Sequence, residues 1–225
     1  MTATTVLVYD ATNANIAHLP AGMAAGYTTG SSDIRWTASS WAKHPQAVRI
    51  DQDAAASDPT ADVIDVEAGA ATIAEVPGWV IRAAVDYHDA RRPGQRSPAV
   101  YCSRSNVTAV CNALIAAGVK GGVGLWIADW DGNHDKAAAE VANASGPFPV
   151  IGRQYANAGL YDVSVFSAQW LQEVSVAAPV PPPVPPGQWK NPGQWTWKDV
   201  YECGIGVDGK FHIFHLENGE WVKLR

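Results

Sequence analysis

Two acidic side chains, Asp65 and Glu67, stand two positions apart at the end of the apolar run Val63–Val66. Residues i and i+2 of a β-strand face the same side, so the two carboxyls are expected to lie together. Carboxyls held close together cannot both ionise cheaply, so one stays protonated near neutral pH and can act as a general acid. Cleavage of a glycosidic bond uses such a pair. Two acids on the surface at a strand end would give the same pattern, so the pair has to be judged in its context.

Further acids stand at the ends of other apolar runs. These are Asp10 in the first, Asp51 and Asp53 after the third, Asp129 after the sixth, and Asp162 before the eighth. The carboxyl ends of the strands form the catalytic face of a β/α barrel, so we expect Asp10, Asp51, Asp53, Asp65, Glu67 and Asp129 to converge there. Aromatic residues that could stack on sugar rings accompany them: Tyr9, Tyr27, Trp126, Trp130, Tyr155 and Tyr161. Trp126 and Tyr155 could equally belong to the core.

The elements that must position these residues form a strand-then-helix rhythm. Strands are expected at Thr5–Asp10, Met23–Tyr27, Ala47–Ile50, Val63–Val66, Ala99–Cys102, Gly124–Ala128, Pro149–Gln154 and Val163–Phe166. Helices are expected within Ser31–His44, Pro77–Arg91, Ser105–Ala117, Asp135–Ala144 and Ser167–Val174. This alternation predicts an α/β fold with parallel strands, either an open doubly wound sheet or a closed barrel. No Gly-rich phosphate-binding loop follows the first strand, and we favour a compact (β/α)8 TIM-type barrel with short loops.

Six short motifs, in order, resemble those of the family 25 glycoside hydrolases, the muramidases of phages and bacteria. They are Asp10 on strand one, Asp65-Val-Glu67 on strand four, Val100–Ser103 on strand five, Leu125–Ala128 on strand six, Gln154-Tyr155 on strand seven and Asp162 at strand eight. The resemblance covers about residues 5–172. The third strand differs, because Arg49–Asp53 replaces the family's Tyr-His-Phe, and the second strand lacks its Lys-x-x-Glu-Gly.

The resemblance implies roles for individual residues. Glu67 would be the general acid, Asp65 would stabilise the developing cation or position an acetamido group, and Asp10 and Asp162 would tune and orient them. Substrate-binding residues would be Tyr9, Asp51, Asp53, Tyr101, Trp126, Asp129, Gln154 and Tyr155. The implied function is hydrolysis of the glycan strand of peptidoglycan, as in an endolysin. The alternative is a non-catalytic glycan-binding or phage virion protein on the same barrel.

A run of six prolines in eight residues, 179–186, divides the chain. Such a run forms a semi-rigid extended spacer, so we expect a barrel domain at 1–178, a proline-rich linker at 179–186 and a separate module at 187–225. The module contains four of the ten Trp residues and the turn signals Asp208-Gly209 and Asn218-Gly219, which predict a small antiparallel β-sheet. Its aromatics either form its own core or bind cell-wall glycan, and the module could mediate homo-oligomers.

The composition excludes several classes of partner. The net charge of −6 and the absence of a basic run argue against nucleic acid. No segment reaches the roughly 18 apolar residues that would span a bilayer, and Met1–Asp10 does not resemble a signal peptide. Action outside the cell would therefore follow release by another route or delivery in a virion. The three cysteines form no zinc or disulfide pattern, and no metal ligand set or cofactor is expected.

Overall fold

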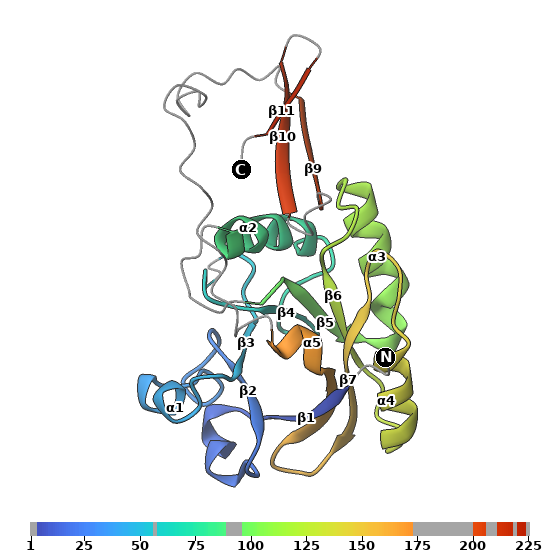
Figure 1. Cartoon of the computed structure of the whole chain (residues 1–225). Helices are drawn as coiled ribbons and strands as arrows, with labels where there is room; N and C mark the ends of the chain where they lie inside the picture. The colour runs from blue at the N-terminus through green and yellow to red at the C-terminus, as the bar shows by residue number, and fades with distance from the viewer. Residues whose placement is uncertain are drawn as a thin grey trace.

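Eight strands form a closed barrel in the order β1 to β8 (Figure 1). The computed structural model describes residues 4–55, 58–88, 96–172, 200–205, 211–217 and 220–223. The barrel strands are β1 (Thr5–Asp10), β2 (Met23–Tyr27), β3 (Val48–Asp51), β4 (Val63–Val66), β5 (Ala99–Ser103), β6 (Gly124–Ala128), β7 (Val150–Asn157) and β8 (Asp162–Ser167). Every strand expected from the sequence is present within a few residues of its predicted bounds, and the closed barrel is confirmed over the open sheet.

The last strand departs from the eight parallel strands of the expected (β/α)8 pattern. Strands β1 to β7 pair in parallel, whereas β8 runs antiparallel to both β7 and β1. Only residues 158–161 separate β7 from β8, and the backbone N–H of Ala158 donates to the Tyr161 carbonyl at 2.9 Å. A connection this short makes a hairpin, because a parallel return needs a crossover of a dozen or more residues.

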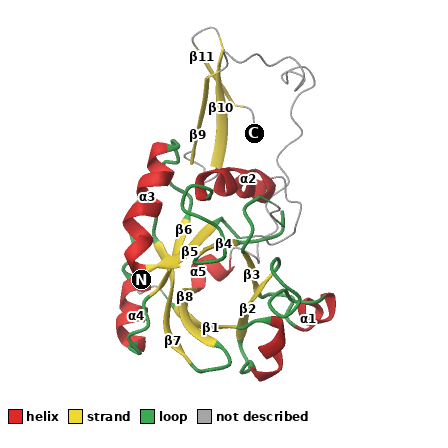
Figure 2. Ribbon diagram, turned by 180° about the vertical axis from the view of Figure 1, so that it is seen from behind, coloured by secondary structure: helices red, strands yellow, loops and turns green. Residues whose placement is uncertain are grey.

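In the described part of the chain, an α-helix lies at each of the five stretches expected from the sequence. The α-helices are α1 (Ala38–Lys43), α2 (Val76–His88), α3 (Val107–Ala116), α4 (His134–Ala142) and α5 (Ala168–Gln172), and the 3-10 helices are η1 (Asn13–His18) and η2 (Arg104–Asn106). Figure 2 shows α3 and α4 along one side of the barrel and α1 on the opposite side. Helix α1 begins at a Thr37 cap, whose hydroxyl accepts from the backbone N–H of Ser40 at 3.2 Å. No helix in the described part of the chain is long and apolar enough to cross a membrane.

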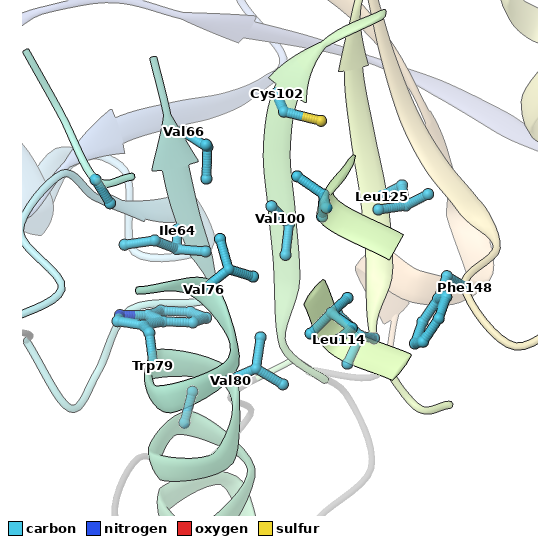
Figure 3. Close-up of a cluster of buried hydrophobic side chains, with 14 of the residues drawn as sticks. Ile64, Val66, Val76, Trp79, Val80, Val100, Cys102, Leu114, Leu125 and Phe148 are labelled. Carbon is cyan, nitrogen blue, oxygen red and sulfur yellow. The ribbon is translucent and has the colours of Figure 1, made fainter. Parts of the chain in front are cut away.

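Alternation along the strands sorts the buried side chains into two layers. One apolar cluster fills the barrel, with members such as Val8, Val63 and Phe166. A second lies between the barrel wall and helices α2 and α3 and includes Ile64 and Trp79 (Figure 3), and a smaller third cluster contains Ala24, Trp36 and Ala47. Because neighbouring residues of a strand point to opposite faces, a residue two positions from an interior one also points inward.

Helix α5 covers the amino end of the barrel. The indole N–H of Trp170 donates to the carbonyl of Ser97, just before β5, at 3.1 Å, and the backbone N–H of Ala168 donates to the carbonyl of Thr4 at 2.9 Å. Beneath it, buried Arg96 forms an ion pair with buried Asp62 at 3.0 Å. Because α5 covers the amino end, a ligand can reach side chains of the barrel interior only from the carboxyl end.

The C-terminal module contains a three-stranded antiparallel sheet, β9 (Val200–Ile205), β10 (Phe211–Glu217) and β11 (Glu220–Lys223), in the order β11-β10-β9. This confirms the antiparallel sheet expected from its hairpin signals. The proline-rich segment 179–186 and both predicted turns, Asp208-Gly209 and Asn218-Gly219, lie outside the described residues.

Candidate functional site

Asp10 and Asp162 are direct partners across the β1–β8 ladder. Asp10 ends β1 and Asp162 begins β8, and because β8 is antiparallel, both lie at the carboxyl end of the barrel. Asp10 is only 3% exposed. Burial, followed by the charge of Asp162, raises the pKa of Asp10 to about 8. Burial also raises the pKa of Asp162 to about 6.

The predicted pair on β4 divides into one buried and one exposed acid. Asp65 points into the barrel with Val63, and its side chain is 2% exposed. Burial, and to a lesser degree the charge of Glu67, raises the pKa of Asp65 to about 7. Glu67 follows the end of β4 and is exposed. The two acids therefore lie in different environments, because the chain leaves the barrel wall after Val66.

The four acids expected to be catalytic form one electrostatic group, here called the carboxyl cluster: Asp10, Asp65, Glu67 and Asp162. The charges of the other three members each raise the pKa of Asp10. Burial and the same four acids raise the pKa of the Tyr27 hydroxyl, at the end of β2, well above its ordinary value. Carboxyls with pKa values between about 6 and about 8 can take up or release a proton near neutral pH, as acid–base chemistry requires.

Gln154 of β7 connects the cluster to two aromatic residues. Its Oε1 accepts from the Tyr101 hydroxyl at 2.8 Å and from the Trp130 indole N–H at 2.6 Å. An indole N–H can only donate, so Oε1 must face Trp130, and the amide Nε2 then faces Asp10. Nε2 lies 3.2 and 3.4 Å from the two Asp10 oxygens. Trp130 itself is 60% exposed, so an open aromatic face is tethered to a buried acid through one amide.

Trp126 is a core residue and does not line a surface. It is 1% exposed, its indole N–H donates to Ser164 at 3.1 Å, and its ring packs edge-on against Tyr101 and Phe166. Its contribution to the site is to support Tyr101 from within the barrel.

Asp51 and Asp53 do not join the carboxyl cluster. Asp51 is fully buried and points outward toward α2, where it accepts from the Trp79 indole N–H at 3.0 Å. It also accepts from the Thr29 hydroxyl at 2.8 Å and from the backbone N–H groups of Asp53 and Asp58 at 3.0 and 3.1 Å. Asp53 is exposed and accepts from the backbone N–H of Ala55 at 2.9 Å. Both side chains organise the loop after β3, since the strand alternation turns Asp51 away from the interior.

Asp129 also lies outside the barrel interior. It pairs with Arg104 at 3.2 Å and with buried Arg153 at 3.0 Å, beside Asp131 and Glu140. Tyr9 and Tyr155 are half-buried and make edge contacts, Tyr9 with Tyr161 at 5.8 Å between ring centroids and Tyr155 with His134 at 5.7 Å. Of the eight residues expected to bind substrate, the structure thus links Tyr101 and Gln154 to the cluster by hydrogen bonds.

Gln52, which the sequence did not suggest, touches the site directly, because its Nε2 donates to Asp65 at 3.1 Å. Trp130, expected from the sequence only as one of several aromatic residues near the acids, reaches the site through Gln154. Trp130 was visible as an aromatic beside the acids of residues 129–131, whereas Gln52, between two acids, carried no signal of its own. Among the described residues, no group of three or more His, Cys, Asp or Glu side chains is arranged to hold a metal ion.

Comparisons with protein-family models, with curated proteins and with solved structures each found no match to this chain.

Proposed function

We propose that this chain hydrolyses the glycan strand of bacterial peptidoglycan, as a muramidase-like enzyme. The observation that carries the proposal is the carboxyl cluster: the buried Asp10 and Asp65 and the half-buried Asp162, whose pKa values are raised toward neutrality, next to the exposed Glu67. In this proposal the barrel is a TIM-type scaffold like that of the family 25 glycoside hydrolases, with its last strand reversed. Glycoside hydrolysis is the chemistry that paired carboxyls at a barrel's carboxyl end serve most directly.

Glu67 is assigned as the proton donor to the leaving oxygen, because it is the member of the cluster that a large substrate can reach. Asp65 is assigned to the opposite task. One of its oxygens, Oδ1, is buried without a hydrogen-bond partner among the described residues. An acceptor in that state suits either a developing sugar cation or a donor group of the substrate. Asp10 and Asp162 are assigned to tune and orient Asp65 and Glu67.

Trp130 is assigned as a platform for a sugar ring. It is exposed but held by the Gln154 hydrogen bond, so its face is presented without freedom to turn away. The C-terminal module, with its four Trp residues, is assigned to attachment to the wall or to oligomer formation. The site of action would be the bacterial wall, reached after release or as part of a phage particle.

Incubation of the full-length chain with purified bacterial cell walls tests the proposal. We expect turbidity to fall and reducing sugar ends to appear together, because cleavage of glycan strands produces both. Sedimentation of the chain with the same walls measures binding in parallel. Binding without release of reducing ends from any wall tested would contradict the enzymatic proposal and support the non-catalytic glycan-binding alternative.

A further inference from the structure

Asp65 has two oxygens in different situations. Oδ2 accepts a hydrogen bond from Nε2 of Gln52 at 3.1 Å. Oδ1 is buried and has no hydrogen-bond partner among the residues that the structure describes. A buried acceptor without a partner is costly, so its presence points to a group that arrives with the ligand. The contact with Gln52 determines which of the two Asp65 oxygens stays without a hydrogen bond from the protein.

Gln52 is itself held from behind by a chain of hydrogen bonds. Its backbone N–H donates to the Thr29 hydroxyl at 2.7 Å, and that hydroxyl donates to Asp51 at 2.8 Å. A backbone N–H can only donate, so the hydroxyl hydrogen of Thr29 must point to Asp51. Asp51 is fixed in turn by Trp79 of α2 at 3.0 Å. The loop that carries Gln52 is therefore held by both the segment after β2 and helix α2.

Gly30 leaves space for the other end of the Gln52 amide. A Cβ atom at this position would lie 2.7 Å from Oε1 of Gln52, and the Gly30 φ angle of +102° is one that other residues rarely adopt. The site thus accommodates the amide oxygen at Gly30 while the amide nitrogen faces Asp65. The amide thus lies between Asp65 of β4 and Gly30, while Thr29 holds the backbone of Gln52.

We propose that Gln52 positions the Asp65 carboxyl for its substrate, holding Oδ2 on the protein and leaving Oδ1 to accept a hydrogen bond from a substrate N–H or O–H group. This inference rests on the proposed function, because it assigns Gln52 a task in that same site. A donated hydrogen bond also favours the ionised carboxylate and counters the burial that raises the pKa of Asp65. Gln52 therefore fixes both the direction and the charge of this acid.

The test is an NMR titration of the aspartate carboxyl carbons in the full-length chain, with Asp65→Asn to assign the signal. Gln52→Met keeps the length of the side chain and removes the donor, so we expect the Asp65 midpoint to rise by on the order of one pH unit. Gln52→Glu adds a negative charge and should raise it too. Gln169→Met, an exposed residue of α5, is the matched control and should leave it unchanged. The groups that also act on Asp65, namely Asp10, Tyr27, Glu67 and Tyr101, are the same in every variant.

An unchanged or lower Asp65 midpoint in the folded Gln52 variants would overturn the inference. Wall cleavage supplies the second measurement: Gln52→Met should lower kcat by roughly tenfold and move the acid limb of the pH profile upward, whereas Gln169→Met should do neither. Wild-type rate and profile in Gln52→Met would refute positioning while the proposed function stands. If the wild type cleaves nothing, the proposed function fails, and the titration alone still decides whether Gln52 sets the state of Asp65.

Discussion

Asp10 shows how burial and neighbours set the state of one acid in this site. Its carboxyl lies at the end of β1, 3% exposed, opposite Asp162 and in contact with Gln154. Its pKa of about 8 lies above the ordinary value of 3.8. The folded chain therefore keeps a proton that the unfolded chain loses between those two pH values, and the fold loses stability as pH rises through that window.

Asp10→Asn replaces the protonated acid by a neutral group that can still accept from Gln154. We expect the variant to gain stability relative to the wild type as pH rises, by at least about 1 kcal/mol near pH 9, with a smaller difference near pH 5. Thermal unfolding followed by circular dichroism at both pH values measures this difference. A stability difference that is equal at both values, or that shrinks as pH rises, would contradict the buried, protonated Asp10.

Trp130 should contribute to glycan affinity through its exposed ring. Trp130→Ala removes the ring and should weaken binding of soluble wall fragments by roughly 5- to 30-fold, equivalent to about 1–2 kcal/mol of lost contact. Trp130→Phe keeps a ring but loses the tether to Gln154, so an intermediate affinity is expected. Isothermal titration calorimetry measures both. Wild-type affinity in folded Trp130→Ala would exclude the platform role.

The residue pattern predicted the carboxyl cluster better than it predicted the rest of the site. Asp10, Asp65, Glu67 and Asp162 could be found because period-two spacing and strand ends determine which residues share the interior. The side chain of Asp51 was placed on the wrong side of the barrel wall. It ends β3 in the outward-facing set of positions, where the indole N–H of Trp79 in α2 binds it. The network through Gln154 was also beyond reach, since it joins residues that are distant in the chain.

At the scale of elements, strand positions followed from apolar runs, but strand direction did not. The run that forms β8 has the same composition in either direction, and only the short 158–161 connection makes it antiparallel. That reversal matters for the site. It puts Asp162, the first residue of β8, at the same barrel end as Asp10, the last residue of β1.

The glycines of β2 and α2 offer a paired test of packing around the barrel. A Cβ atom at Gly26 would overlap the ring of Trp36, which is buried and hydrogen-bonded to the Ala11 carbonyl at 2.8 Å. Gly26→Ala should therefore lower the free energy of unfolding by about 3 kcal/mol. At Gly78 of α2 the nearest atom is the Arg82 Nη1 at 3.5 Å, so Gly78→Ala should be neutral or stabilising by up to about 1 kcal/mol. Urea unfolding compares them, and an equal effect of both changes would contradict the close approach of Trp36 to β2.

The whole molecule combines a barrel that closes on itself with a separate antiparallel sheet. The barrel is complete at β8, and α5 ends at Gln172. The proline-rich segment was predicted from composition alone to divide the two, and that boundary stays a prediction.

A chain shortened to residues 1–175 should keep the unfolding midpoint of the barrel, since every barrel strand and α5 remain. Its binding to cell walls, or its mass in solution, should fall if the module mediates attachment or oligomers. Calorimetry, wall sedimentation and light scattering give the three quantities. A shortened chain that fails to fold would refute the domain division, and one with unchanged binding and mass would refute the role of the module.

The central claim is that Glu67 donates the proton that breaks a glycosidic bond. The most direct measurement is mass spectrometry of the fragments released from purified glycan strands by the wild type, Glu67→Gln and, as a control, Asp33→Asn, an exposed acid before α1. The amide keeps the shape of Glu67 but cannot donate and recover a proton, so release should fall by on the order of 10²–10⁴-fold, with folding and glycan binding retained. Asp33→Asn should match the wild type. Equal release by folded Glu67→Gln and an active wild type would contradict the account.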